Sequence, residues 1–458
     1  MPNHLDLVPH CTGETAARCN NQIPMKVVLV GDNRMSPNWG RGADLALYQM
    51  LSERFEIIGT IPGSYFLLHC AGFGYIRTFT PARYNRILLD MICHREKKKI
   101  FNWYASLEEL FGAKDFIAED PQESVDNLIC YRHRYPQLAA IYNLISDADL
   151  VIVNGNGDMV LTTPPRREAL FLLAMSHLGT ILGKRVAFIN SMLSDCPETG
   201  RNQRTLEATR RVLSACQAVS LRDPSSLAYA AKEMPDVKCG YIPDSLFSWY
   251  PLFENPELNL PANGDFSLPF PERSQDFGKL DFSKPYVCIG GSGLAAKCGE
   301  NLVQYFTQLV IRYKELGYVV YLTVNDGPDS FLEKVADLTG VGIIHKGTSI
   351  LLAGAILANA RLFISGRYHP SIFASLGGTP CIFLDSQAHK MTSLQQVMEY
   401  GQQRQFPLFF SRQDLEEITS LSMEYIRQGE SLRSNIRSVA SRRCFEARNI
   451  AQFIQDRA

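Results

Sequence analysis

An arginine and a histidine, Arg367 and His369, form the pair of residues in this sequence best suited to chemistry. The apolar residues 362–364 before them predict a buried strand, and a helix is predicted to begin at or after Pro370. Ligands of open α/β sheets bind beyond the carboxyl ends of the strands, so we expect both side chains at a binding edge. A fixed cation beside a titratable imidazole suits an anionic substrate that also needs a proton. In the alternative interpretation, His369 only caps the helix or hydrogen-bonds to a loop carbonyl.

Arg222 stands in a similar place, at the tip of another predicted strand. The apolar residues 218–221 end at Arg222 and Asp223, and a helical pattern begins directly after them. A carboxylate in that position commonly caps a helix, which is the simplest interpretation of Asp223. Arg222 has no evident helical or core role, and this favours a function. Asp244 follows one more short predicted strand, at residues 239–242.

Polar and glycine-rich turns follow other predicted strands. A turn of this kind before a helix favours an anion, although a plain strand-to-helix connection explains it equally well. No turn reads GxGxxG, so the sequence carries no dinucleotide fingerprint. The candidate binding residues at these turns are Asn38, Asn154, Gly290, Gly291 and Ser292.

Predicted strands alternate with helical patterns along most of the chain, which is typical of α/β folds with parallel sheets. The chain has 458 residues, too many for one core, so two domains are expected. Closely spaced prolines at residues 243–285 argue against a helix or central strand there and mark the domain boundary. We therefore predict two doubly wound Rossmann-like domains that face a cleft. The predicted segments are a mobile tail at 1–24, an N-terminal domain at 25–245 with an insertion at about 60–148, a Pro-rich linker at 246–285, a C-terminal domain at 286–411 and C-terminal helices at 412–458.

Composition narrows the class of protein. Hydrophobic residues make up 46% of the sequence and charged residues 20%, as in ordinary globular proteins. The formal net charge of −1 gives the protein no general attraction to nucleic acid. No apolar run reaches the length of a membrane span, and the N-terminus lacks the apolar core of a signal peptide. The 12 cysteines include no CxxC pair or zinc spacing, which favours free thiols in a reducing compartment. We expect a cytoplasmic protein.

Basic and aromatic residues are interleaved at residues 77–99, and a second basic cluster lies at 131–134. One interpretation is peripheral contact with an anionic membrane face, or a grip on a phosphorylated acceptor. The other is a solvated helix face.

With these strand tips in view, the chain resembles the polysaccharide pyruvyl transferase family from about residue 26 to residue 400. The strongest match is the Gly-Arg-Tyr-His motif at 366–369. The N-terminal loop departs from the family pattern at residues 40–43, where a Gly-Asp is common. Further matching features are the loop at 38–43, the turn at 151–157, the Ser-Leu-Arg-Asp-x-x-Ser segment at 220–226, the Pro-Asp tip at 243–244, Ala374, the Gly-Thr-Pro at 378–380 and Lys390.

This resemblance implies both a fold and a reaction. Family members are similar in architecture to two-domain GT-B glycosyltransferases. They move the pyruvyl group of phosphoenolpyruvate onto two hydroxyls of a sugar, which gives a cyclic ketal. The implied partners are phosphoenolpyruvate and a lipid-linked or nucleotide-linked sugar, without nucleic acid, cofactor or metal.

The resemblance also implies a role for each matching residue. His369 becomes the general acid, and Arg222 and Arg367 become the clamp for the donor. Lys390 is a candidate for the donor phosphate, with a surface lysine as the alternative. The remaining candidates are Asn38 and Asp244 on the acceptor side, Asn154 as a substrate contact, and the backbone of Gly290, Gly291 and Ser292 near the donor.

Two other functions stay open at this point. The first is a GT-B glycosyltransferase that uses a nucleotide sugar, because it shares the cleft and the cationic strand tips. The second is a non-catalytic sugar-binding assembly subunit. The combined presence of Arg222, Arg367 and His369 argues against the second.

Overall fold

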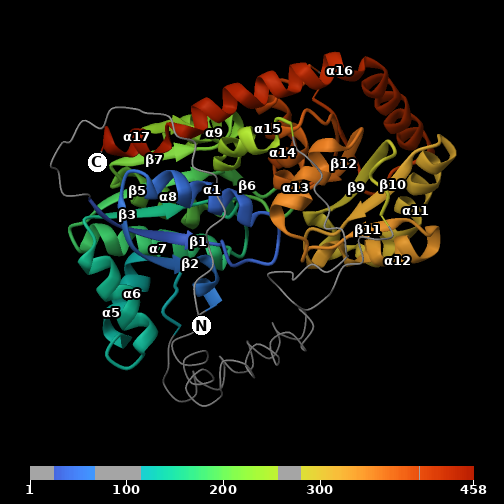
Figure 1. Cartoon of the computed structure of the whole chain (residues 1–458). Coiled ribbons are helices and arrows are strands. Elements are labelled where there is room, and N and C mark those ends of the chain that lie inside the picture. Colours follow the sequence, from blue (N-terminus) through green and yellow to red (C-terminus); the bar gives the residue numbers. More distant parts are fainter. Residues whose placement is uncertain (1–24, 68–114, 256–279, 402, 458) are drawn as a thin grey trace, which may run out of the picture.

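The computed structural model describes residues 25–67, 115–255, 280–401 and 403–457. Two six-stranded parallel sheets form the centres of two α/β domains that lie side by side (Figure 1). The predicted tail at 1–24 and the basic segment at 77–99 lie outside the described residues. No helix in the described ranges has the combined length and hydrophobicity of a membrane span.

The N-terminal domain is built on the strand order β2–β1–β3–β5–β7–β8. Its central strand β3 is buried along its whole length, as expected for a strand of a parallel sheet that helices cover on both faces. The strands are β1 (Lys26–Asp32), β2 (Glu56–Pro62), β3 (Leu150–Asn154), β5 (Arg185–Ser191), β7 (Ala218–Leu221) and β8 (Cys239–Tyr241), with a separate pair β4 (Val160–Leu161) and β6 (Ser194–Asp195). The helices are α1 (Arg41–Ser52), η1 (Gly63–Leu67), α5 (Pro121–Tyr131), α6 (Pro136–Asp147), α7 (Arg167–Ile181), α8 (Gln203–Ser214) and α9 (Pro224–Glu233).

The described part of the predicted insertion at about 60–148 is more regular than we expected. Strand β2 pairs with β1, and α5 and α6 pack into the core of the N-terminal domain. Asp120 caps α5, and each of the two helices has a proline in its first turn, where no intrahelical donor is lost. The glycine and proline within β2 weakened its strand signal, so this edge strand was missed.

The C-terminal domain has the strand order β11–β10–β9–β12–β13–β14. Its chain winds outward in one direction from β9 and then in the other from β12, so the switch point lies between these two strands. The strands are β9 (Tyr286–Ser292), β10 (Val319–Thr323), β11 (Gly342–Ile344), β12 (Leu362–Gly366), β13 (Cys381–Leu384) and β14 (Gln405–Phe406). The helices are η4 (Gly293–Lys297), α11 (Gly299–Glu315), η5 (Gly327–Ser330), α12 (Phe331–Thr339), α13 (Ile350–Asn359), α14 (Tyr368–Leu376) and α15 (Lys390–Val397).

The start of the predicted Pro-rich linker is helical and buried, which corrects the expectation of an irregular segment. It forms η2 (Ser245–Trp249) and the single turn α10 (Tyr250–Phe253), in which Pro251 occupies the first turn. Its side chains share one hydrophobic cluster with Trp39 of the N-terminal domain and Phe373 of the C-terminal domain. This segment therefore joins the two domains through a common core.

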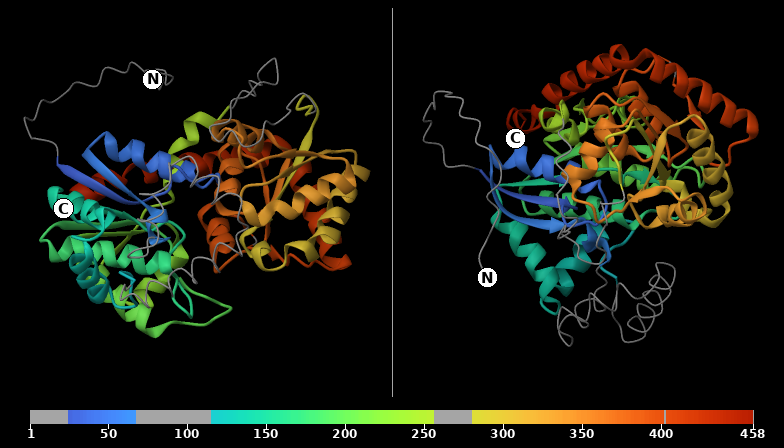
Figure 2. Two further views of the ribbon diagram at one scale, coloured as in Figure 1. Left: turned by 90° about the horizontal axis from the view of Figure 1, so that it is seen from below. Right: turned by 45° about the vertical axis from the view of Figure 1, so that its right-hand side comes forward.

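The C-terminal helices run back across both domains, in red in Figure 1 and in the right-hand view of Figure 2. Helix α16 (Arg412–Arg448) contacts α14 of the C-terminal domain and η2. It is kinked at Gly429, whose φ of +55° favours glycine. Helix α17 (Ile450–Gln455) packs against α1 in the core of the N-terminal domain.

Candidate active site

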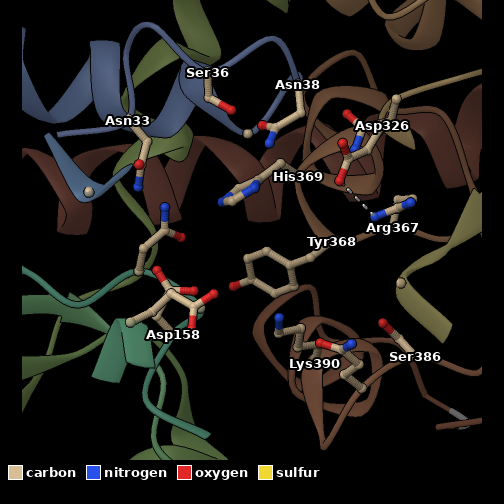
Figure 3. Close-up of a pocket in the computed structure, with 18 of the residues that line it drawn as sticks. Asn33, Ser36, Asn38, Asp158, Asp326, Arg367, Tyr368, His369, Ser386 and Lys390 are labelled. Carbon is tan, nitrogen blue, oxygen red and sulfur yellow. Dashed lines mark ion pairs between the residues drawn. The ribbon is translucent and has the colours of Figure 1, made fainter. Parts of the chain in front are cut away.

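A cleft of about 530 Å³ opens between the two domains, and the ends of strands from both sheets line it. Residues after β1 and β3 come from the N-terminal domain, and residues after β9 and β12 come from the C-terminal domain. These strands flank the point in each sheet where the winding direction changes, which is where open α/β sheets bind ligands. Figure 3 shows the lining side chains that converge on this space.

Helix α14 presents Tyr368 and His369 to the cleft. It begins at Tyr368, two residues earlier than predicted, so His369 lies in its first turn and not in a preceding loop. Pro370 is tolerated there because the amides of a first helical turn have no intrahelical acceptor. The first helical hydrogen bond runs from the amide of Ser371 to the carbonyl of Arg367.

Asp244 lies between Arg222 and His369, two predicted functional residues that belong to different domains. Its Oδ2 accepts a hydrogen bond from Arg222 Nη1 at 2.9 Å and lies 3.4 Å from His369 Nε2. The side chain is fully buried. Burial alone would raise the pKa of this carboxyl, but His369 and Arg222 more than offset that effect and hold the pKa at about 2. Asp244 is therefore a permanent anion that orients both partners.

Arg222 is held rigidly at the end of β7. Its Nη1 also donates to Asn156 Oδ1 at 2.9 Å, and its guanidinium lies 4.4 Å from the centre of the Tyr368 ring. Only 1% of the residue is exposed. A Cβ atom placed on Gly157 would lie 3.4 Å from Arg222 Nη2 and 3.1 Å from Lys390 Nζ. Both cations therefore point at one small space in front of Gly157.

Lys390 is the first residue of α15 and is partly buried at the floor of the cleft. Burial, together with the nearby charges of Arg222 and Arg166, lowers the pKa of its ammonium group to about 7, against a small opposing effect of Asp158. The repulsion of Lys390 by these neighbouring cations is unfavourable. A bound anion would relieve it.

Arg367 lines the same cleft but is already paired. Its Nε and Nη2 donate to Asp329 Oδ1 at 3.1 and 2.7 Å, and Nη1 lies 3.9 Å from Asp326. Burial raises the pKa of Asp329, and Arg367 partly counteracts this. Gly291 makes the pairing feasible, because a Cβ there would overlap the Asp329 carboxylate.

The predicted binding residues separate into two groups. Asn38 lines the cleft together with Lys390, Arg222, Arg367 and His369. The others lie behind the surface of the cleft: Asp244, which was expected on the acceptor side, and Asn154, Gly290, Gly291 and Ser292 do not line it.

The predicted residues that do not line the cleft hydrogen-bond to the residues and loops around it. Asn154 Nδ2 donates to Asp44 Oδ1 at 2.8 Å, and its Oδ1 accepts from Asn190. Ser292 Oγ donates to the carbonyl of Asp385 at 2.5 Å, and the residue that reaches the cleft after β9 is Gly293.

Sequence reasoning missed Asp44, which lies in the first turn of α1 and lines the cleft. It is 2% exposed, and burial raises the pKa of its carboxyl well above the usual value, helped by the charges of Asp32 and Asp244. A carboxylate in the first turn of a helix ordinarily only balances the helix dipole, so no signal set this one apart. Asp158 and Arg166, 3.5 Å apart, are further cleft residues without a distinct signal.

Four of the lining side chains carry a buried polar atom with no hydrogen-bond partner in the described part of the chain. Such atoms are uncommon in folded proteins, and their gathering in one cleft indicates a place for polar ligand groups. The atoms are Asp44 Oδ2, Arg222 Nε, Tyr368 Oη and His369 Nε2, the last of which has only the 3.4 Å ion pair with Asp244.

Comparison with known proteins identifies the family. The model of the polysaccharide pyruvyl transferase family matches residues 45–387, about three quarters of the sequence. The chain belongs to this family. The predicted resemblance is thereby confirmed, and the family indicates an enzyme that transfers a pyruvyl group. No curated protein matches the sequence.

A solved structure with a TM-score above 0.5 shows the same fold. The UDP-GlcNAc 2-epimerase from Neisseria meningitidis, bound to UDP-GlcNAc, matches with a TM-score of 0.51 and 14% identity over 94% of this chain and 99% of that chain. The spinosyn rhamnosyltransferase matches with a TM-score of 0.43 and 13% identity over 94% and 100%. At such identity the likeness concerns the fold alone. The predicted fold class, two doubly wound Rossmann-like domains in a GT-B-like α/β arrangement, is confirmed.

Proposed function

We propose that this member of the family transfers the pyruvyl group of phosphoenolpyruvate onto two hydroxyls of a sugar in a cell-surface polysaccharide precursor. The products are a cyclic ketal and phosphate. The observation that carries the proposal is the convergence of Arg222 Nη2 and Lys390 Nζ on Gly157, beside the His369–Asp244 pair. A small trianion with a nearby acid is the ligand that this arrangement suits best.

Binding of the donor uses the cations of the cleft. The phosphate is placed beside Gly157, where Arg222 Nη2 and Lys390 Nζ approach the same position. Arg367 stands near the other end of the donor and takes the carboxylate, while Asp329 fixes the direction of its guanidinium.

The first chemical step adds a proton to the donor. Protonated His369 gives its proton to the methylene carbon, which becomes a methyl group and leaves an oxocarbenium-like centre at the neighbouring carbon. Asp244 stabilises the imidazolium before the transfer, as a buried carboxylate 3.4 Å from Nε2. A sugar hydroxyl then attacks the cationic carbon, and its proton returns to His369.

The second step replaces the phosphate. The carbon–oxygen bond to phosphate breaks, and Arg222 and Lys390 stabilise the departing group. The second hydroxyl closes the ring, and its proton leaves with the phosphate as hydrogen phosphate. Charges and protons balance without an oxidant, cofactor or metal ion.

The acceptor side is assigned to the polar residues that follow β1. Asn33, Ser36 and Asn38 face the cleft opposite Lys390 (Figure 3). Amide and hydroxyl groups of this kind suit a sugar, carried on a lipid or a nucleotide. We place the reaction on the cytoplasmic side of the membrane, where the donor is made.

The proposal is tested by measuring phosphate release from phosphoenolpyruvate, with and without lipid-linked or nucleotide-linked sugars. Acceptor-dependent release is the expected result. A parallel thermal-shift measurement compares phosphoenolpyruvate with a panel of nucleotide sugars, because a ligand that binds the folded state raises its stability. Stabilisation by a nucleotide sugar alone, without phosphate release, would replace the proposal with the glycosyltransferase alternative.

A variant of the acid provides the mechanistic check. His369→Ala should remain folded, although less stable because Asp244 loses one of its two partners, and should lower turnover by about a hundredfold or more because the proton donor is lost. The exposed His133 supplies a matched control, His133→Ala, which should keep full activity. Normal turnover of His369→Ala would remove this residue from the mechanism.

A further inference from the structure

A polar cluster links the two domains directly beside the anion-binding cations. Asp223 Oδ1 of the N-terminal domain lies 3.1 Å from His389 Nε2 of the C-terminal domain. The same oxygen accepts a hydrogen bond from Ser393 Oγ at 2.9 Å. Two domains are thus tied together by one buried carboxylate, which is 2% exposed.

The hydrogen bonds around Asp223 fix which group donates. Its Oδ2 accepts from Ser226 Oγ at 2.8 Å, and its Oδ1 accepts from the amide of Ser226. Because the Ser226 hydroxyl gives its proton to Asp223, its oxygen is left to accept from His389 Nε2 at 3.1 Å. Nε2 is therefore the donor toward both Asp223 and Ser226. Burial would raise the pKa of Asp223, but His389 and these hydrogen bonds lower it on balance, so the carboxylate stays charged.

Both members of the pair are chain neighbours of the donor-site cations. Asp223 directly follows Arg222, and His389 directly precedes Lys390. Asp223 is also the N-cap of α9, so its backbone position is fixed by the helix. Movement of His389 relative to Asp223 therefore moves Lys390 relative to Arg222.

The backbone before His389 supports a positioning role. Ala388 has a φ of +50°, a left-handed conformation that is unfavourable for a residue with a side chain. Backbone strain of this kind persists only where surrounding contacts enforce it, and it gathers at functional sites. The contacts that hold the next residue here are those with Asp223 and Ser226.

We propose that His389 and Asp223 are a positioning pair, which holds Lys390 opposite Arg222 so that the two cations clamp the phosphate of the donor. This inference rests on the proposed function and extends it. Neither residue lines the cleft, so the pair acts through Lys390 and not by touching the substrate.

The experiment is a double-mutant cycle on donor affinity in the full-length chain. The dissociation constant of phosphoenolpyruvate is measured calorimetrically for the wild type, His389→Ala, Lys390→Met and the double variant. His389→Ala should weaken binding about tenfold, on the order of 1.4 kcal/mol. In the Lys390→Met background the same change should have no further effect, because the group that it positions is gone.

Two further variants separate positioning from general structural damage. His389→Gln keeps an N–H donor for Asp223 and should restore most of the affinity. Ser225→Ala removes the nearby cross-domain hydrogen bond from Ser225 Oγ to Gln396 Oε1, which touches neither cation, and should leave affinity unchanged within about twofold.

Proton uptake gives a second readout that works even when Lys390→Met binds too weakly to measure. At pH 8 the wild type should take up about 0.9 proton on binding, because a group with a pKa of about 7 is then mostly neutral. His389→Ala frees Lys390 from its enforced position, so its pKa should rise and the uptake should fall.

The outcomes separate a failure of the proposed function from a failure of the positioning role of His389 and Asp223. A wild type that binds neither phosphoenolpyruvate nor inorganic phosphate refutes the proposed function, and the positioning role falls with it. Normal wild-type binding with additive effects in the cycle, or with unchanged proton uptake in His389→Ala, overturns the positioning role alone.

Discussion

The most informative perturbation of the cleft is a change of pH, because the pKa of Lys390 is about 7. Burial is the largest cause, followed by repulsion from Arg222 and Arg166. A bound phosphate adds negative charge beside Lys390 and should return the pKa of its ammonium group toward its usual range near 10. Donor binding should therefore draw a proton onto Lys390 at any pH above 7.

The size of the effect on donor affinity follows from the difference between the pKa of Lys390 and the pH of the measurement. The charged form of Lys390 is needed for binding, and its population in the free protein falls as the pH rises through 7. At pH 8 about one molecule in eleven carries the proton, and charging the rest costs about 1.4 kcal/mol. The apparent affinity for phosphoenolpyruvate should thus fall about tenfold per pH unit above pH 7.

The assay is calorimetric titration at pH 8 in two buffers with different ionisation enthalpies, which reports the number of protons taken up. Lys390→Arg is the matched control, since its guanidinium stays charged throughout this range. That variant should show no uptake from this position and an affinity that is flat between pH 7 and pH 9. A wild type that takes up no proton, or that binds equally well at both pH values, would refute the reasoning.

Two other substitutions follow from the same geometry. Gly157→Ala puts a methyl group 3.1 Å from Lys390 Nζ and 3.4 Å from Arg222 Nη2, so donor affinity measured by calorimetry should fall at least about tenfold while the melting temperature stays unchanged. Asp44→Asn removes a buried carboxyl whose pKa is raised, and such a group makes the wild type less stable as pH rises from about 4, where it ionises in the unfolded chain. The variant should be more stable than the wild type in urea at pH 8, with a gap that narrows toward pH 4. A deficit at both pH values would contradict a raised pKa of the Asp44 carboxyl.

The sequence correctly predicted the cleft residues that directly follow the end of a strand. Arg222 and Arg367 lie 145 positions apart and in different domains, yet each directly follows a buried apolar strand, and open parallel sheets bind ligands at the carboxyl ends of their strands. The cleft accordingly contains both arginines, with His369 and Lys390. Asp223 caps α9, as the simplest interpretation had it.

The sequence was less informative about which polar group at a strand tip faces the cavity. Asn154 ends β3 and was expected at the substrate, but its side chain turns to Asp44, and Asn156 reaches the cleft instead. The choice depends on the turn: Asn156 has a φ of +42°, a conformation that no local pattern demanded. Gly291 was ambiguous in the same way. The sequence cannot tell whether a glycine leaves room for a ligand or, as here, for the side chain of Asp329.

Asp244 shows why the two halves of the proposed reaction depend on each other. A fully buried carboxylate is unfavourable unless cations and hydrogen bonds compensate for the loss of water, and here the compensation comes from Arg222 on the N-terminal side and His369 on the C-terminal side. In the proposed reaction, the carboxylate that lies beside the acid, His369, thus also fixes the guanidinium of Arg222, to which the donor phosphate is assigned. Since the two partners come from different domains, the proton donor and the phosphate site are in register only when the domains pack as they do around η2. The shared carboxylate therefore links the position of the proposed acid, the position of the proposed phosphate-binding guanidinium and the arrangement of the two domains.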